Sequence, residues 1–371
     1  MTNIGNYDTM DKRIQNILEE YNMIDNHKTW AVPEYSKRQI NNAGKTIANP
    51  NASTEERDEA LKILNNWRAA HAYPLQVIYN NLRKKNPDAI VVQRLKRLES
   101  ITGKIQRFPN MQLYKMQDLG GCRVIVDSIS EVYEAIDQYK NSRIRHELKQ
   151  ERDYIQDPKD SGYRCCHMVY QYHSDKNETY NKSILIEIQF RTKLQHIWAT
   201  AVEMMALVTR SNLKASQGNK DILRFFTLVS SLFAIEEHTP VCPNTSNDEN
   251  ELLKEINDVN QKHHIIDTLN ALSKTIKVNI PNNDIKNKKI EYYVLALNYK
   301  ERYVNVYGYS KGNIEQATFV YNKLESNATN DENIVLVSAD SIDLLKLAYP
   351  NYFADIHTFI NIINKYNTKS Y

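Results

Sequence analysis

The chain has 371 residues, which is enough for two or three compact domains and a sizeable core. Its hydrophobic content of 41% and charged content of 25% are ordinary for a soluble globular protein. The formal net charge is only +3, so any attraction to polyanions has to come from local clusters of basic residues. The sequence has no apolar leader and no run of eighteen apolar residues, which predicts a cytoplasmic protein without a membrane segment.

The first part of the chain has helical patterns. Ser53 and Glu56 are spaced as a capping box, and Leu64 and Trp67 follow on one apolar face. A further helix is expected from about residue 88 to 107, because apolar residues recur there at helical spacing. The stretch from residue 83 to 107 has eight basic and two acidic residues. Its basic face is either solvated or, beside a partner motif, a phosphate site.

Short apolar segments then alternate with helical ones. Strands are expected at 122–126, 168–173 and 184–190, and helices at 129–139 and 192–209. This order predicts an α/β (α+β) fold with a mixed sheet and flanking helices.

The last ninety residues are richer in tyrosine and in β-branched residues. Strands are expected at 289–299, 301–310 and 333–339, and helices at 314–324 and 341–365. They predict a small C-terminal α+β domain. The expected regions are an N-terminal helical region (1–87), a core (88–210), a helical connector (211–275) and the C-terminal domain (276–371).

Two acidic residues lie beside or within the predicted strands. Asp118 precedes the pair Gly120 and Gly121, and Glu187 is the only charged residue in the apolar run ILIEIQF. A buried acid costs on the order of several kcal/mol unless it is paired or binds a metal. Two carboxylates on neighbouring strands, together with lysines and arginines, are typical of magnesium-nucleotide chemistry. The alternative is that Asp118 belongs only to a turn and Glu187 only to a salt bridge.

Four stretches carry a family resemblance: RLKRLESITGK, QDLGGCRV, DYIQDPKDSGYRCCH and EIQFRT. In this order they resemble the synthetase domain of the RelA/SpoT-type alarmone synthetases, which has a nucleotidyltransferase-like fold. The resemblance covers residues from about 90 to 205. It implies a pyrophosphokinase that moves the β,γ-pyrophosphate of ATP to a ribose 3′-hydroxyl and releases AMP.

The resemblance also implies roles for single residues. Asp118 and Glu187 would bind Mg2+, and Glu187 would activate the attacking hydroxyl. Arg94 and Arg123 would enclose the adenine of ATP between their guanidinium planes. The triphosphate would lie along Lys96, Ser100, Lys104 and Arg107.

A third group of residues would bind the pyrophosphate acceptor. Tyr163 is expected to stack on the acceptor base. His167, Gln189 and Arg191 are further acceptor-binding candidates, and each also has an ordinary structural explanation. Where the family often reads GYQS, this chain reads GYRC. Arg164 would add a cation near the acceptor, which suits an acceptor richer in phosphate than a free nucleotide.

The whole-chain layout is similar to the fused toxin-antitoxin synthetases of the CapRel type. That resemblance implies a toxic enzyme that pyrophosphorylates the 3′ CCA end of tRNA, and a C-terminal domain that covers the active site through a Tyr-x-x-Tyr motif. Here the motif is YPNY, in which Tyr349 and Tyr352 would lie between Arg94 and Arg123. Binding of a phage protein, such as a capsid protein, would release the block in anti-phage defence. The structural alternative is a helix break with two packed tyrosines.

Two other functions remain open at this point. One is a (p)ppGpp or (p)ppApp alarmone synthetase that is regulated by its C-terminal domain. The other is a non-catalytic RNA-binding protein that retains the nucleotide fold. The pair Asp118 and Glu187 counts against the second function, since a binding module has no need of two metal-ligand acids.

Overall fold

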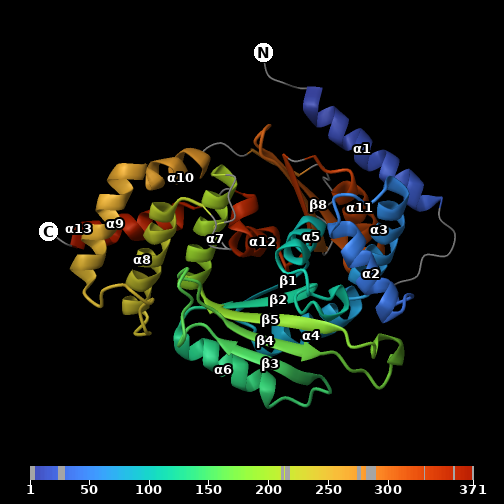
Figure 1. Ribbon diagram of the computed structural model, residues 1–371, viewed down its shortest axis with the longest axis horizontal. Helices are drawn as coiled ribbons and strands as arrows, with labels where there is room; N and C mark the ends of the chain where they lie inside the picture. The colour runs from blue at the N-terminus through green and yellow to red at the C-terminus, as the bar shows by residue number, and fades with distance from the viewer. Residues whose placement is uncertain are drawn as a thin grey trace.

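A computed structural model of the chain describes residues 5–23, 30–209, 213, 218–273, 277–280, 290–329, 331–353 and 356–369. Its centre is a nine-stranded mixed sheet, and helices surround that sheet (Figure 1). The predicted mixed sheet with flanking helices is therefore confirmed. Within the described ranges, no helix has both the length and the apolar character needed to cross a bilayer.

Four helices precede the first strand: α1 (Gly5–Asn22), α2 (Lys37–Ala48), α3 (Thr54–Ala69) and α4 (Ala72–Lys85). The predicted capping box of α3 is present, because Ser53 accepts from the Glu56 amide and the Glu56 side chain accepts from the Ser53 amide. Leu64 and Trp67 of α3 are both 1% exposed. They anchor these helices on the apolar core beneath the sheet.

The central part of the chain supplies five strands and three helices. The strands are β1 (Ile90–Leu95), β2 (Gly120–Val126), β3 (Glu147–Asp153), β4 (Cys166–Gln171) and β5 (Leu185–Thr192). The helices are α5 (Leu98–Arg107), α6 (Ile129–Lys140) and α7 (Lys193–Val208). The predicted strands at 122–126, 168–173 and 184–190 correspond to β2, β4 and β5.

The helix expected from 88 to 107 is wrong in its first half. Residues Ile90–Leu95 form strand β1, and the helix α5 begins only at Leu98. β1 is antiparallel to β2 on one side and to β9 on the other. The β-branched run IVV pairs with β2, and Gln93 and Arg94 also pair with β9, so this stretch belongs to the sheet and the helical spacing of the apolar residues continues only from Leu95 onwards.

The last third of the chain forms a helical group and a second set of strands. The helices are α8 (Lys220–Glu236), α9 (Glu249–His263), α10 (Ile265–Ser273), α11 (Ile314–Ser326), α12 (Ile342–Ala348) and α13 (His357–Lys369). The strands are β6 (Lys277–Asn279), β7 (Ile290–Asn298), β8 (Tyr303–Ser310) and β9 (Glu332–Ser338). The expected boundary between residues 275 and 276 lies outside the described residues.

The C-terminal strands continue the central sheet. The strand order is β3-β4-β5-β2-β1-β9-β7-β8-β6, and β9 joins the two halves by pairing Gln93 with Ser338 and Arg94 with Val337. The C-terminal helix α13 lies beside α8 and α9 (Figure 1), and its Phe359 belongs to the same apolar cluster as Phe226 of α8. The expected C-terminal domain therefore shares both a sheet and a core with the rest of the chain.

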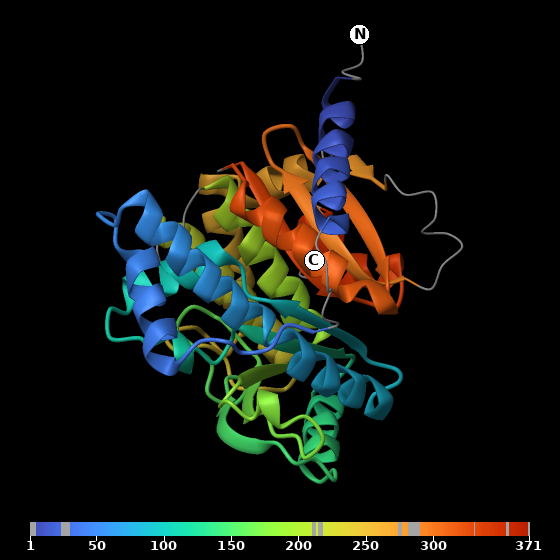
Figure 2. The ribbon, with the colours of Figure 1, turned by 90° about the vertical axis from the view of Figure 1, so that its right-hand side faces the viewer.

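The two halves also lie side by side across the sheet. Figure 2 shows the C-terminal strands above the core strands and helices α2–α4, whereas α1 lies beside the C-terminal part and packs on α11. One apolar cluster joins Val92 of β1 and Ile125 of β2 to Val337 of β9, and it includes Tyr349 and Tyr352. The tyrosines of YPNY are thus part of a core that the two halves build together.

Candidate active site

One face of the sheet around β2 and β5 carries polar side chains. Arg123 on β2 pairs with Gln189 on β5, and Gln189 pairs with His167 on β4. Residues two apart on a strand share a face, so Glu187 and Arg191 point the same way as Gln189. The other face carries buried apolar residues, namely Val124, Ile186, Ile188 and Phe190. The sheet thus separates the apolar core from a single polar face.

Asp118 lies just before β2 and is held by two lysines. Lys96 Nζ donates to its Oδ2 at 2.7 Å, and Lys104 Nζ donates to its Oδ1 at 2.9 Å. Burial would raise the pKa of Asp118, but the two lysines outweigh it and hold this pKa at about 2. Burial, with repulsion by Lys104 and Arg94, lowers the pKa of Lys96 despite its ion pair with Asp118. The site therefore carries more positive charge than the single carboxylate of Asp118 can neutralise.

Glu187 is oriented by a chain of hydrogen bonds. His167 Nδ1 lies 2.9 Å from Glu187 Oε1, and Gln189 Nε2 donates to Oε2 at 2.7 Å. The Tyr163 hydroxyl lies 2.7 Å from His167 Nε2 and so continues the chain. Burial would raise the pKa of Glu187, but the hydrogen bond and the charge of His167 outweigh it and lower this pKa. Glu187 is therefore a carboxylate at neutral pH, with both oxygens directed by neighbours.

His167, the histidine of this hydrogen-bonded network, is held in its charged form. Burial alone would lower the pKa of His167, but its polar neighbours, among them the Glu187 carboxylate to which it is hydrogen-bonded, outweigh burial and raise it. For Tyr163, burial is the main cause that raises its pKa to about 12. The tyrosine therefore keeps its proton at neutral pH. An imidazolium between a phenol and a carboxylate fixes the direction of each hydrogen bond.

The two carboxylates fit a magnesium ion that arrives with a nucleotide. Asp118 precedes β2 and Glu187 lies on β5, and these strands are parallel neighbours, with Gly121 opposite Glu187. The charge of Asp118 also raises the pKa of Glu187, as expected for neighbouring acids. No group of three or more His, Cys, Asp or Glu side chains suited to a metal occurs among the described residues. Mg2+ commonly takes one or two carboxylates and completes its shell with phosphate oxygens and water.

The turn before β4 fixes the position of Tyr163. Gly162 has a φ of +85°, a conformation that favours glycine. A Cβ at this position would lie 2.9 Å from side-chain atoms of Ser230 and Trp198. Gly162 therefore lets the loop lie close against α7 and α8.

Tyr163 lies in a small aromatic group on the polar face. Its ring meets those of His167 and Tyr154 edge-on, with centroids 5.6 Å and 6.1 Å away. The ammonium group of Lys159 lies 4.1 Å from the Tyr154 centroid and 5.1 Å from that of Tyr163. Aromatic faces beside an exposed lysine suit a base that carries phosphate. Lys159 was not among the residues predicted from the sequence, although its place in the Pro-Lys-Asp turn is a signal for a loop cation.

The expected role of Arg164 near the acceptor is wrong. Arg164 is 3% exposed, and it donates to Ser230 Oγ at 3.0 Å, to Ile155 O at 3.2 Å and to Pro240 O at 2.6 Å. In extended backbone, successive side chains point to opposite sides, so Arg164 points away from the face that Tyr163 occupies. It ties the loop to α8 and does not favour a phosphate-rich acceptor.

Three arginines on adjacent strands lie near one another. They are Arg94 on β1, Arg123 on β2 and Arg191 on β5. Burial, together with the charges of Arg191 and Arg94, lowers the pKa of Arg123. Within the described part of the chain, the Nε atoms of Arg123 and Arg191 are buried and have no hydrogen-bond partner. Such a cluster is favourable only beside an anion or an aromatic face.

The YPNY motif supplies the aromatic face. Tyr349 follows α12, and the guanidinium carbon of Arg123 lies 5.7 Å from its ring centroid. Arg123 Nη1 also donates to Ala348 O at 3.1 Å, and the Tyr349 hydroxyl donates to Gln93 O at 3.1 Å. Tyr349 is 3% exposed, and burial raises its pKa to about 12 although Arg123 and Arg94 oppose this. The motif therefore contacts Arg123, one of the two arginines predicted to bind adenine.

Tyr352, the second tyrosine of the motif, contacts other residues of the C-terminal part. Its hydroxyl donates to Asn333 Oδ1 at 2.9 Å, and its ring centroid lies 6.4 Å from that of Tyr349. The alternative of a helix break also describes the local backbone, because α12 ends at Ala348 and a short 3-10 turn begins at Pro350. Figure 1 places α12 between α5 and α7, over the polar face.

The residues predicted to bind the triphosphate fall into two groups. Lys96 and Lys104 meet at Asp118, as described above. Ser100 is half-buried and Arg107 is exposed in the last turn of α5. Lys96 lies before α5 and not on its face, because β1 precedes this helix.

Two further residues contact the C-terminal part and were missed in the sequence. His196 on α7 places Nε2 3.0 Å from Leu347 O. Arg68 on α3 is 1% exposed and pairs with Glu325 of α11. Arg68 follows Leu64 by one helical turn, so a charge on the buried face of α3 was the signal for it.

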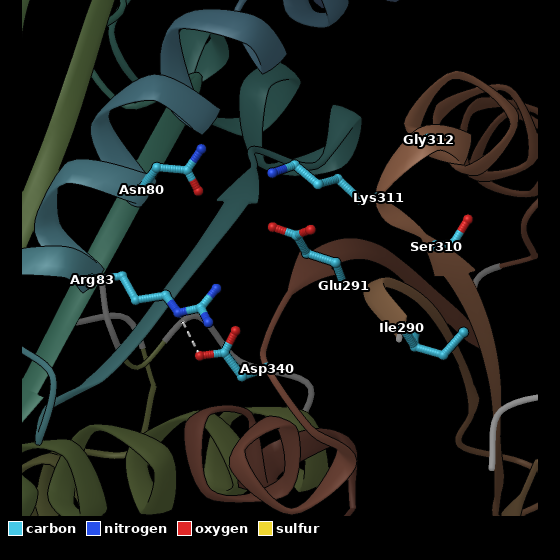
Figure 3. A pocket seen from close by; sticks show the side chains of 8 residues that line it. All are labelled: Asn80, Arg83, Ile290, Glu291, Ser310, Lys311, Gly312 and Asp340. Atoms are coloured by element: carbon cyan, nitrogen blue, oxygen red, sulfur yellow. Dashed lines mark ion pairs between the residues drawn. The ribbon is translucent and has the colours of Figure 1, made fainter. Parts of the chain in front are cut away.

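The cavity in Figure 3 lies away from this polar face. It has a volume of about 500 Å³ and lies between α4 and the C-terminal strands. Its lining residues are Asn80, Arg83, Ile290, Glu291, Ser310, Lys311, Gly312 and Asp340. Arg83 and Asp340 pair across it at 2.7 Å, and none of the predicted site residues lines it.

Residues 93–206 match the family model described as a region found in RelA / SpoT proteins. The GTP pyrophosphokinase YjbM of Bacillus subtilis is 30% identical over 128 residues, which are 34% of this chain and 60% of that protein. The GTP pyrophosphokinase YwaC of the same organism is 29% identical over 127 residues, with 33% and 60% coverage. The chain thus spans about 60% of the length of these two relatives.

The chain also matches a solved structure. The small alarmone synthetase 1 of Bacillus subtilis, bound to its product pppGpp, is 22% identical. The match covers 44% of this chain and 90% of that one, with a TM-score of 0.37. The range 93–206 that matches the family model contains both acids and the whole polar face.

Proposed function

We propose that this chain, with a RelA/SpoT region at its centre, is a pyrophosphokinase that uses ATP and is inhibited by its own C-terminal part. The observation that carries the proposal is the polar face of the sheet. There, Asp118 lies just before β2 and Glu187 lies on the neighbouring strand β5, beside a surplus of lysines and arginines. Such a surplus suits the four negative charges of a nucleoside triphosphate.

The reaction would use this face as follows. The acceptor 3′-oxygen attacks the β-phosphorus of ATP, the new oxygen-phosphorus bond forms, and the bond from that phosphorus to the α,β-bridging oxygen breaks to release AMP. Glu187, ionised and aligned by His167, takes the hydroxyl proton. Asp118 and Glu187 would hold Mg2+, which neutralises phosphate charge when bound. Lys96 and Lys104 would exchange Asp118 for phosphate oxygens.

The C-terminal part would block the donor side, by which we mean the part of the polar face around Arg94 and Arg123 that would bind ATP. Tyr349 covers Arg123 from the side on which a planar base would stack, and the hydrogen bond to Gln93 O fixes the ring. Tyr349 and adenine would therefore compete for the same arginine. The block is intramolecular and so acts at a high effective concentration.

The acceptor we propose is the 3′-hydroxyl of the CCA end of tRNA, so that the released enzyme stops translation. The chain would then be a fused toxin-antitoxin protein of the CapRel type, with release by a capsid-like phage protein in anti-phage defence. What supports this is the order of a synthetase region followed by a covering C-terminal part with a Tyr-x-x-Tyr motif.

A guanine nucleotide is the second candidate acceptor. The two curated relatives are named GTP pyrophosphokinases, and they match the region that carries Tyr163 and Glu187. With Arg164 buried, the sequence argument for a phosphate-rich acceptor no longer stands. The experiment therefore has to offer both acceptors.

The test uses the full chain, because α13 and β9 complete the core and the sheet of the central part. The wild type and Tyr349→Ala are incubated with Mg2+ and ATP labelled at the γ-phosphate, in the presence of deacylated tRNA, GDP or GTP. Label on tRNA from the variant but not from the wild type supports the proposal. Label on guanine nucleotides alone assigns the second acceptor. No transfer to any acceptor by either protein overturns the pyrophosphokinase.

A further inference from the structure

A carboxylate from the C-terminal part lies at the start of α5. Glu325, in the last turn of α11, accepts a hydrogen bond from the Leu98 amide at 2.8 Å through Oε1. Its Oε2 lies 2.5 Å from Arg68 Nη1. One side chain from residues beyond 300 thus contacts both a helix N-terminus and a buried cation of the first hundred residues.

Arg68 is a buried cation that several hydrogen-bond acceptors surround. Its side chain is 2% exposed, and Asn65 of its own helix accepts from Nη2 at 2.9 Å. Three further acceptors are on α11: Tyr321 Oη at 3.2 Å, Asn322 Oδ1 at 2.8 Å and the carboxylate of Glu325. A buried guanidinium that loses its counter-ion costs on the order of several kcal/mol. If α11 moved away, Arg68 would need another anion.

The groups that contact the Glu325 carboxylate are of the kind that bind a phosphate. A backbone amide at a helix N-terminus and a guanidinium are the usual ligands of a phosphate group. The α5 helix has ten residues, and Lys96, two residues before Leu98, binds Asp118. The charge of Glu325 also acts on Tyr352 of the YPNY motif, so the carboxylate lies close to the blocked donor side.

We propose that Arg68 and the Leu98 amide form an anion site for a phosphate group of the donor nucleotide, and that Glu325 occupies this site while the C-terminal part is docked. This inference rests on the proposed function, because it takes the donor to be a nucleoside triphosphate. The C-terminal part then fills two places, with Tyr349 on the base side and Glu325 on the phosphate side. Loss of either contact would therefore weaken the block.

The test measures binding of inorganic tripolyphosphate, without metal, to the full chain by calorimetry. Glu325→Gln keeps the size of the side chain but removes its charge, so tripolyphosphate should bind about 10-fold tighter or better than to the wild type, a range typical of coupled sites. Adding Arg68→Gln should abolish the gain. Glu332→Gln is the matched control, because Glu332 pairs with Arg13 of α1. No gain in Glu325→Gln, or a gain that survives Arg68→Gln, overturns the anion site.

A second variant covers the case in which Glu325→Gln does not fold. Glu325→Asp keeps the charge but shortens the side chain by one methylene, which weakens its contact with Leu98 or with Arg68. We expect a smaller gain in binding that again depends on Arg68, and no gain counts against the proposal. Because the probe is not a substrate, binding through Arg68 without label transfer by Tyr349→Ala would retain the anion site and overturn the proposed function.

Discussion

The acceptor side and the donor side of the polar face are satisfied in different ways. On the acceptor side, Glu187 is bonded to His167 and Gln189, and His167 to Tyr163. All of these partners lie within residues 93–206, the range that matches the family model. This network is complete without the C-terminal part.

On the donor side, the cations depend on distant segments. Arg123 contacts Ala348 and Tyr349, and Arg68 pairs with Glu325. More than 200 residues separate each arginine from these partners. The hydrogen bonds around Glu187 are therefore formed in advance, whereas the arginines contact groups that, under the proposed function, a nucleotide would replace.

The largest effect should come from the two acids that we propose bind Mg2+. In the Tyr349→Ala background, Asp118→Asn should lower pyrophosphate transfer by roughly a thousandfold, because a metal site contributes several kcal/mol of charge stabilisation. Glu187→Gln should have an effect of the same order. Initial rates with labelled ATP measure it, and circular dichroism checks the fold. A folded variant that keeps more than a tenth of the activity would remove that residue from the site.

The donor side should respond in the opposite direction. Tyr349→Ala should raise transfer by the full chain about 10-fold or more, since it removes the ring from Arg123. Tyr349→Phe keeps the ring and loses only the bond to Gln93 O, so its increase should be smaller. Equal rates in the two variants would assign the block to the hydroxyl, and two rates as low as the wild type would refute the block.

A moderate effect is expected from the chain that aligns Glu187. His167→Gln should lower the transfer rate of the Tyr349→Ala background by roughly 10- to 100-fold. It should also move the acid limb of the pH profile to higher pH. The sign follows because His167 lowers the pKa of Glu187, so its loss raises that pKa and protonates the base at a higher pH. Tyr163→Phe, which keeps the ring, should shift the limb less. An unchanged limb in His167→Gln would falsify the proposed alignment.

The smallest effect concerns stability in acid. The pKa of Asp118 is about 2 in the fold and has an ordinary value of 3.8. Its lowered pKa contributes roughly 2 kcal/mol to the free energy of unfolding above the ordinary value, and this contribution is lost as the pH falls towards 2. Urea unfolding across this window should show a steeper loss for the wild type than for Asp118→Asn. Parallel curves would mean that the two lysines do not stabilise Asp118.

The sequence was most informative where the signal was local. Alternating apolar residues gave β2, β4 and β5, and the spacing of Ser53 and Glu56 gave the start of α3. An acid inside an apolar strand marked Glu187, and the structure does place it on a strand beside the one that follows Asp118. These features depend on residues a few positions apart.

The errors arose where distant segments decide the structure. The predicted helix extends the spacing that begins at Leu95 back over the run IVVQRL, but β2 and β9 pair with this run and make it a strand. Arg164 follows Tyr163 directly, and yet α8 and the loop at Pro240 bury it on the opposite side. The local sequence does not indicate which distant carbonyl groups a side chain will contact in the folded protein.

The sequence by itself determined the helices, most of the strands, and the acids and cations that line one face of the sheet, because these follow from periodicity and residue chemistry. Only the tertiary structure decided that β9 would extend the core sheet, and that α11 and α12 would bring Glu325 and Tyr349 to its cations. The physical reason is that buried charges need partners. Only the folded chain brings partners from hundreds of residues away to Arg68 and Arg123.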